Sequence, residues 1–186
     1  MSSAMDMDCI FYEVKVDTLG MIYTCFVADV RNSSENRLKF VQGDHLSGKK
    51  NVDLSGFEVE NIKIPSIPSN LGKFVTNLKA LAWIQTDLDS IKADDLKQFP
   101  HLIFLEVTRN LLTSLDSDLF KHNPNIKMIN FENNRLSNIG ESILDGLNHL
   151  TTVNFKSNYC TIDHVAHKKS EIKKIKKLIA ENCSEK

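Results

Sequence analysis

The sequence predicts a curved, right-handed solenoid of the α/β class, with a parallel β-sheet on its concave side and a cap at each end. Three observations predict this fold. An apolar pattern recurs every 24 residues, an asparagine recurs in register with it, and two cysteines lie on each side of the repeated region. Because each repeat of a solenoid packs only on its neighbours, the number of repeats and the two ends determine the architecture.

The repeated pattern places apolar residues at the first, fourth and sixth positions of each repeat, which starts at Leu54, Leu78, Leu102, Ile126 and Leu150. A period of about 20–29 residues with the form LxxLxLxxNxL is typical of leucine-rich repeats, in which each repeat contributes one short strand. We therefore predict a leucine-rich-repeat solenoid over residues 54–163. Its repeats are 54–77, 78–101, 102–125, 126–149 and a partial one at 150–163.

The ninth position carries Asn110, Asn134 and Asn158. A short amide at this point can bond the backbone of the turn that follows the strand, where ladder partners are lost. The sequence therefore predicts an asparagine ladder inside the solenoid. Ile62 and Thr86 take this position in the first two repeats, so those turns need other partners.

Residues 9–53 are predicted to form the N-terminal cap, and residues 1–8 a disordered leader. The segments 9–14 and 22–27 alternate like strands and are joined by a turn-forming stretch at 17–20, which predicts a β-hairpin. A further strand is expected at residues 38–41. His45 lies there alone and is interpreted as a surface or hydrogen-bonded residue, because nothing nearby completes a metal site.

Residues 164–186 are predicted to form a helical C-terminal cap. An apolar stripe on one face of the helix should cover the open end of the core, with lysines on the solvated face and Ser170 as the helix N-cap. The stripe consists of Ile172, Ile175, Leu178 and Ile179. His164 and His167 would face each other on a helix at this spacing, but the sequence offers no third ligand.

The four cysteines allow three pairings. A hairpin brings Cys9 near Cys25, and a solenoid keeps its two ends apart, so the economical pairing is Cys9 with Cys25 and Cys160 with Cys183. Each bond would stabilise the fold by roughly 3 kcal/mol in the chain-entropy model. The alternative is four reduced cysteines in a cytosolic protein.

Composition and motifs exclude several classes of function. The chain of 186 residues has a net charge of −1 and a pI near 6.6, which gives no reason to expect nucleic acid or an anionic membrane as a partner. No apolar run approaches the roughly 18 residues of a membrane span. The sequence has no GxSxG, HExxH, CxxC or Gly-rich phosphate loop, so we expect no enzyme activity, no cofactor and no metal site.

Two sequons at Asn32 and Asn182 are candidate glycosylation sites. With the cysteines, they favour a secreted protein whose signal peptide is absent from this chain, since residues 1–6 lack the apolar stretch of one.

The chain resembles the short, secreted leucine-rich-repeat proteins of insects. The resemblance lies in the hairpin with Tyr23-Thr24-Cys25, the segment 43–45, the repeats, and the cap from Asn158-Tyr159-Cys160 to Asn182-Cys183. It implies binding of proteins or foreign ligands in adhesion, development or innate immunity. Mosquito immune members also carry a C-terminal coiled coil that pairs two chains, which this sequence lacks.

The candidate binding surface is the concave sheet, whose outward positions are the third, fifth, seventh and eighth of each repeat. Phe104 and Met128 are apolar residues that the core does not need, and carboxylates surround them, as in protein interfaces. The alternative is that they only cover the sheet or contact a cap. The predicted site consists of Ala82, Ile84, Phe104, Glu106, Thr108, Arg109, Met128, Asn130 and Glu132.

The sequence thus predicts a non-enzymatic extracellular module that binds a protein ligand, or a second copy of itself through the concave or cap surface. The alternative is a structural or adhesive secreted protein without a discrete ligand.

Overall fold

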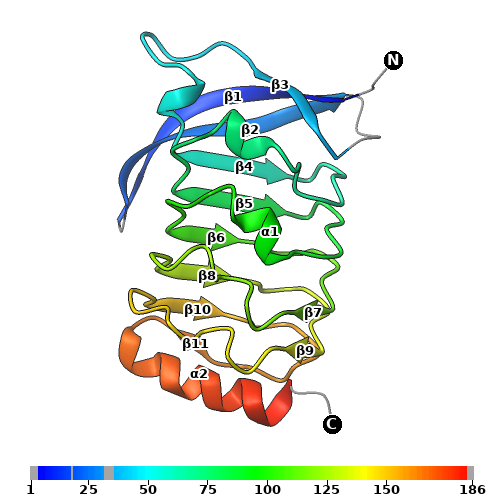
Figure 1. Ribbon diagram of the computed structural model, residues 1–186, viewed down its shortest axis with the longest axis vertical. Helices are drawn as coiled ribbons and strands as arrows, with labels where there is room; N and C mark the ends of the chain where they lie inside the picture. The colour runs from blue at the N-terminus through cyan, green and yellow to red at the C-terminus, as the bar shows by residue number, and fades with distance from the viewer. Residues whose placement is uncertain (1–3, 18, 32–35, 184–186) are drawn as a thin grey trace.

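The structure, a computed structural model, describes residues 4–17, 19–31 and 36–183. Within them, nine strands form one sheet in the order β11-β10-β8-β6-β5-β4-β2-β1-β3, and β7 and β9 form a second sheet. Figure 1 shows the strands stacked along the long axis, with α2 across one end. The strands of the main sheet that precede the first repeat are β1 (Met5–Val16), β2 (Gly20–Arg31) and β3 (Leu38–Gln42).

Each repeat contributes one strand to the main sheet, and these strands are β4 (Gly56–Glu60), β5 (Ala80–Ile84), β6 (Phe104–Glu106), β8 (Met128–Asn130) and β10 (Thr152–Asn154). They pair in parallel with no shift in register, so that Leu81 lies beside Leu105 and Leu105 beside Ile129. These three side chains are at most 1% exposed. The predicted solenoid and its 24-residue register are confirmed.

The asparagine ladder is also confirmed. The amide nitrogen of Asn134 donates to the carbonyls of Val107 at 2.8 Å and Phe131 at 3.1 Å, and its oxygen accepts the N–H of Leu112 at 3.3 Å. The repeat that has Thr86 in the asparagine position is served by the next one, because the oxygen of Asn110 accepts the N–H of Thr86 at 2.9 Å. Each asparagine therefore joins two repeats.

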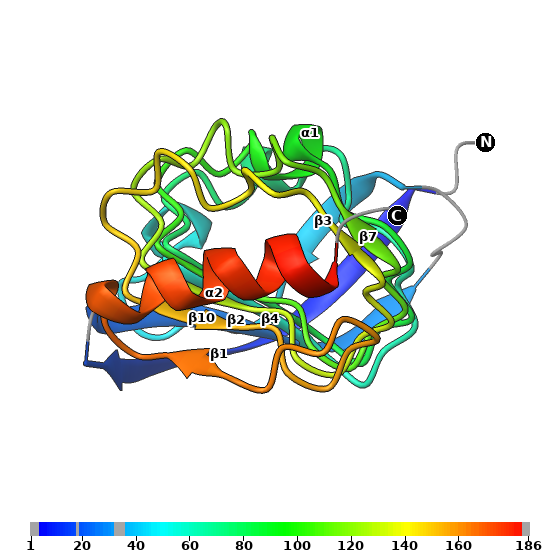
Figure 2. The same cartoon turned by 90° about the horizontal axis from the view of Figure 1, so that it is seen from below.

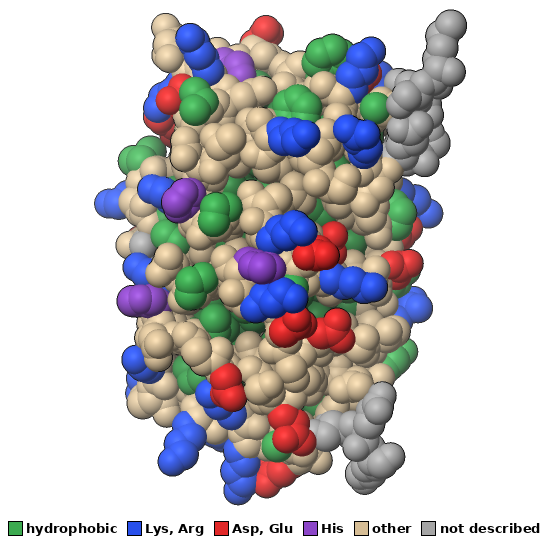
Figure 3. All heavy atoms as spheres, in the orientation of Figure 1, with side chains coloured by type: hydrophobic (Ala, Val, Ile, Leu, Met, Phe, Trp, Pro, Cys, Tyr) green, Lys and Arg blue, Asp and Glu red, His purple; other side chains and the backbone are tan. Residues whose placement is uncertain are grey.

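The opposite side of the solenoid carries little regular structure. Its described elements are the one-turn helix α1 (Ala93–Leu96), the short strands β7 (Ser114–Leu115) and β9 (Asn138–Ile139), and the 3-10 helices Asn51–Asp53 and Leu71–Lys73. On this face, positive and negative side chains are interspersed (Figure 3), and some form ion pairs such as Lys97 with Asp94 at 3.2 Å. This mixed surface offers no extended region of one charge.

The N-terminal cap starts earlier than the sequence predicts. β1 begins at Met5, and Met5 and Met7 are 2% and 0% exposed. The segment is held on both sides, since β2 pairs with β1 antiparallel and β3 pairs with it in parallel. The expectation of a disordered leader is therefore wrong for residues 5–8, because alternate methionines enter the core. The predicted hairpin and third strand are confirmed, whereas Asn32 lies outside the described residues.

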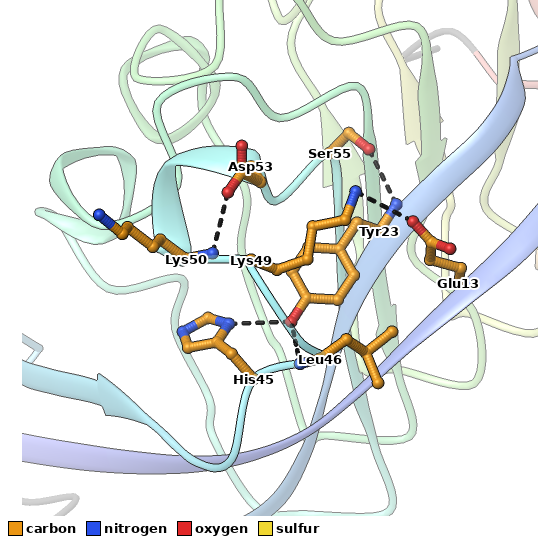
Figure 4. Close-up of polar contacts among 8 residues, drawn as sticks. All are labelled: Glu13, Tyr23, His45, Leu46, Lys49, Lys50, Asp53 and Ser55. Carbon is orange, nitrogen blue, oxygen red and sulfur yellow. Dashed lines mark hydrogen bonds and ion pairs between the residues drawn. The ribbon is translucent and has the colours of Figure 1, made fainter.

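A cluster around Tyr23 fastens the loop after β3 to the hairpin (Figure 4). The Tyr23 hydroxyl lies 2.9 Å from Nδ1 of His45 and accepts the N–H of Leu46 at 3.2 Å. The His45 ring stacks on Phe11 with centroids 4.0 Å apart, and Lys49 pairs with Glu13 at 3.1 Å. His45 is thus hydrogen-bonded within the cap, as the sequence suggests.

The C-terminal cap consists of β11 (Val165–Ala166), which pairs antiparallel with β10, and α2 (Lys169–Asn182). The helix N-cap is Lys168, so Ser170 lies inside the helix and the predicted N-cap is wrong. His164 and His167 precede the helix and do not share a face of it. The predicted apolar stripe is confirmed, because its members pack on the core with Ile175 and Ile179 fully buried.

Both predicted disulfides are present. The Cα atoms of Cys9 and Cys25 are 5.3 Å apart, and those of Cys160 and Cys183 are 5.1 Å apart. The first bond closes the hairpin, and the second fastens α2 to the last repeat. Each end of the solenoid core is therefore sealed by a covalently closed cap.

Candidate recognition site on the concave face

The concave face of the sheet is made of the side chains at the third and fifth positions of the repeats. Parallel pairing aligns Gly56, Ala80, Phe104 and Met128 in one row. It aligns a second row at the fifth position, which consists of Glu58, Ala82, Glu106, Asn130 and Asn154. The first row changes from small to larger apolar side chains along the solenoid, and the second row changes from Glu58, Ala82 and Glu106 to the amides Asn130 and Asn154.

The β1–β2 hairpin bends over the N-terminal half of this face. Figure 2 shows β1 on the side of the sheet opposite α1, and in Figure 1 the turn of the hairpin reaches down beside β4 and β5. A cavity of about 250 Å³ lies between the hairpin and the sheet. The hairpin lines it with Tyr12, Val14, Val16, Leu19, Ile22 and Thr24.

The floor of the cavity is formed by the smallest side chains of the concave face. Gly56, Ala80 and Ala82 lie on the neighbouring strands β4 and β5, and Phe104 of β6 bounds them. A Cβ atom at position 56 would collide with the hydroxyl of Thr24. The hairpin therefore packs closely at Gly56, while the two alanines leave the space open.

Two carboxylates border the cavity. Tyr12 donates a hydrogen bond from its hydroxyl to Oε2 of Glu58 at 2.8 Å. Burial, reinforced by this hydrogen bond and by the charge of Glu58, raises the pKa of Tyr12 well above its usual range. Tyr12 is therefore a neutral donor at physiological pH, and it connects the hairpin to the first repeat.

Glu106 lies where the cavity meets the polar half of the face. Its Oε1 accepts hydrogen bonds from Thr108 at 3.3 Å and from the amide of Asn130 at 3.2 Å. Burial raises the pKa of Glu106, and the charge of Glu58 adds to this, while the two hydrogen bonds and Arg109 oppose it. Glu106 is therefore a partly desolvated carboxylate that a cation would stabilise.

The C-terminal half of the face is a connected polar network. The Asn154 amide donates to Oε2 of Glu132 at 3.0 Å, and the Asn130 side-chain oxygen accepts the Glu132 N–H at 3.1 Å. The Asn154 oxygen accepts the N–H of Lys156 at 3.0 Å. The polar side chains of this half form hydrogen bonds within the network, whereas the other half of the face has an open cavity.

The eighth position of every repeat has a structural role that the sequence analysis did not assign. Its residues have left-handed backbone, with φ of 58° at Asn61, 53° at Gln85, 56° at Arg109, 61° at Asn133 and 58° at Ser157. In the first four repeats the backbone N–H of this residue donates to the next repeat, as where Arg109 N–H donates to the carbonyl of Glu132 at 3.1 Å. This position therefore turns the chain away from the sheet.

Comparisons with known proteins agree with this geometry. Residues 100–159 match the family profile described as "Leucine rich repeat". A structure of a TLR13–ssRNA13 complex superposes with a TM-score of 0.54 at 17% identity, covering 69% of this chain. The APL1 leucine-rich repeat domain superposes with a TM-score of 0.51 at 17% identity, covering 85% of this chain. The fold is a leucine-rich-repeat solenoid.

The chain spans only 18% of the TLR13 chain and 44% of the APL1 chain. A comparison with curated proteins gave no match. The comparisons therefore support the leucine-rich-repeat fold and do not identify a ligand of this solenoid.

The solenoid brings the predicted site residues into two adjoining groups. Ala82, Ile84, Phe104 and Glu106 line the cavity. A neighbouring depression of about 160 Å³ is lined by Glu106, Thr108, Arg109, Glu132 and Asn133. Met128 lies beside Phe104 on the neighbouring strand, and Asn130 is connected to the second group by its hydrogen bond to Glu106.

Thr108 is buried, although the sequence predicts that it lies on the outer surface. It is only 6% exposed, and its hydroxyl bonds Glu106. It therefore positions a carboxylate and offers little surface to a partner.

Sequence reasoning missed the contribution of the hairpin. The signal was present, since Tyr12, Val14 and Val16 alternate with the residues of β1 that face the other way. A hairpin with apolar side chains on both faces needs cover on both, and the first repeats supply it on this side.

The described residues contain no group of three or more His, Cys, Asp and Glu side chains placed to hold a metal ion. Of the helices in this part of the chain, none is long and apolar enough to cross a membrane.

Proposed function

We propose that this protein is a non-enzymatic recognition module that binds a protein ligand on its concave face. The observation that carries the proposal is the apolar surface around Phe104, which the core does not require, bordered by Glu58, Glu106 and Glu132. An apolar centre inside a polar rim is the usual anatomy of a protein interface. Phe104 and Met128 would be its anchors, and the carboxylates would favour a partner with basic groups.

An extracellular location fits this role. Two disulfides close the caps, and such bonds persist in oxidising compartments. Glycosylation at Asn32 and Asn182 is part of the proposal. The Asn182 amide nitrogen donates to the Thr161 carbonyl at 3.1 Å, so a glycan there would have to replace this contact.

The resemblance to secreted insect proteins makes innate immunity or cell-surface recognition the proposed context. The alternative is a structural or adhesive protein without a discrete ligand, or one that pairs with its own copy. One neighbour is a complex with RNA, but the net charge of −1 and the carboxylates of this concave face favour a protein partner here.

Affinity capture from extracellular fluid tests the proposal with matched variants. Phe104→Gln and Met128→Gln should weaken capture of the partner by about 2 kcal/mol or more, because central apolar anchors dominate interfaces. Leu46→Gln is the control, since Leu46 is an exposed apolar residue in the loop fastened to the other face of the hairpin, where Tyr23 lies. Equal capture by all three variants would reject the concave face. Concentration-dependent sedimentation of the purified chain, without any captured partner, would favour self-pairing.

A further inference from the structure

The cavity beneath the hairpin has the size of a small-molecule site. An engineered apolar cavity of about 150 Å³ binds benzene, whereas this one measures about 250 Å³. It can therefore hold one ring with a short chain. Its walls are apolar at Val14, Ile22 and Phe104, and its floor is formed by methyl groups.

The charge at its border is negative. Glu58, Ala82 and Glu106 are direct neighbours across β4, β5 and β6. Adjacent strands are about 4.8 Å apart, so the two glutamates start roughly 10 Å apart with only the methyl group of Ala82 between them. This spacing leaves room for one positively charged group between two carboxylates.

Each of these carboxylates has one oxygen engaged. The hydrogen bond from Tyr12 ends on Oε2 of Glu58, and those from Thr108 and Asn130 end on Oε1 of Glu106. Among the described residues, no hydrogen bond ends on the other oxygen of either group. The charge of Arg109 acts on Glu106, but Arg109 itself is exposed at the turn after β6. A ligand cation would therefore meet two acceptors inside a site that is partly shielded from water.

We propose that this cavity binds a small primary amine whose apolar body is about the size of one ring. The body would lie on Ala80 and Ala82 against Phe104, and the ammonium group would lie between Glu58 and Glu106. Anions are disfavoured by the two carboxylates, and a neutral ligand leaves both charges unpaired. This site goes beyond protein recognition, because it is complete in the isolated chain.

Isothermal titration calorimetry of the purified protein at neutral pH, with 2-phenylethylamine as the probe, tests the proposal. The amine should bind at one site, and roughly tenfold or more tighter than 2-phenylethanol, which lacks the charge. Phenylacetate, which has the same ring and a negative charge, should not bind. Equal affinities for the amine and the alcohol, or no binding of the amine, would overturn the proposal.

Variants locate the site. Ala82→Leu fills the floor from the outer face of the sheet and should abolish binding, and Glu106→Gln should weaken it by roughly tenfold or more. Glu60→Gln is the control, because it removes a carboxylate of the same sheet that lies outside the cavity lining.

An equal loss of affinity in Glu60→Gln and Glu106→Gln would mean general attraction to an acidic surface and would contradict the site. Normal binding by Glu106→Gln would do the same, whether or not Ala82→Leu folds. Met128→Gln separates this proposal from protein recognition, because Met128 does not line the cavity and its substitution should affect only capture of a protein partner.

Discussion

The two halves of the concave face are built on the same repeat, yet they have opposite character. Near the N-terminal cap, Gly56, Ala80 and Ala82 leave a cavity under the hairpin. Near the C-terminal cap, Asn130 and Asn154 occupy the position that corresponds to Ala82, and both bond Glu132. One half is an open apolar surface with unpaired polar atoms, and the other is a network whose hydrogen bonds are made internally.

This difference shows which positions folding specifies and which it leaves free. The inward residues Leu81, Leu105 and Ile129 are nearly interchangeable between repeats, because every repeat buries the same places. The outward residues obey no such rule, so a solenoid can differ along its length without losing stability. Function is expected where polar groups on the outer surface lack hydrogen-bond partners within the chain.

The largest expected effect separates the two sides of β6. Leu105→Ala should lower the free energy of unfolding by about 2–5 kcal/mol, because it leaves a hole in a fully buried site. Phe104→Gln, one residue away on the outer face, should cost less than about 1 kcal/mol. Urea denaturation of both variants measures these two changes in the free energy of unfolding. Similar losses would show that Phe104 belongs to the core and that the cavity is only packing.

The next effect separates the buried ladder from the outer network. Asn134→Ala should cost about 2–3 kcal/mol, because the carbonyl of Val107 and the N–H of Leu112 lose their partner in a buried place. Asn154→Ala should cost less than about 1 kcal/mol, since its partners are partly exposed and water can replace it. Thermal unfolding by circular dichroism compares the two. If Asn154→Ala is the worse variant, the outer network is structural.

A pH profile examines the boundary between the halves. Since burial raises the pKa of Glu106, the folded chain binds this proton more tightly than the unfolded chain. The stabilisation from Glu106 is therefore fully present below the ordinary glutamate pKa and is lost as the pH rises through the raised value. The difference in unfolding free energy between the native protein and Glu106→Gln should fall over that acidic window and then level off. A flat difference would mean that Glu106 is solvated and that the cavity edge is open to water.

The smallest expected effect concerns the turn after β6. Arg109 has a left-handed backbone, which asparagine tolerates better, and asparagine already occupies the same position at Asn61 and Asn133. Arg109→Asn should therefore raise stability by about 0.5 kcal/mol. Arg135→Asn, at an exposed arginine outside the left-handed positions, should give no gain. Differential scanning calorimetry can resolve the pair.

The sequence could predict what repetition imposes. Leu105 and Asn134 recur at fixed spacing, so their burial and the ladder follow from the period alone. The cysteine pairs followed from the topology of the two ends. The outward placement of Phe104 followed from alternation along the strand.

The rest depends on geometry that no period encodes. The bend of the hairpin brings Tyr12 to Glu58, which is 46 positions away in sequence. The burial of Met5 depends on β3 pairing with β1, and this pairing became visible only in three dimensions. Ala82 was predicted to lie in the binding surface, but the sequence does not show that the small size of Gly56 and Ala82 forms a cavity under the hairpin.

The most direct measurement is a map of backbone amide shifts in the ¹⁵N-labelled protein during titration with 2-phenylethylamine. If the two halves of the concave face differ as described, the shifts should centre on Thr24, Glu58, Ala82 and Glu106, and Asn154 should stay unchanged. Shifts centred on β8 and β10, or spread evenly over the surface, would contradict the division of the concave face into a binding half and a satisfied half.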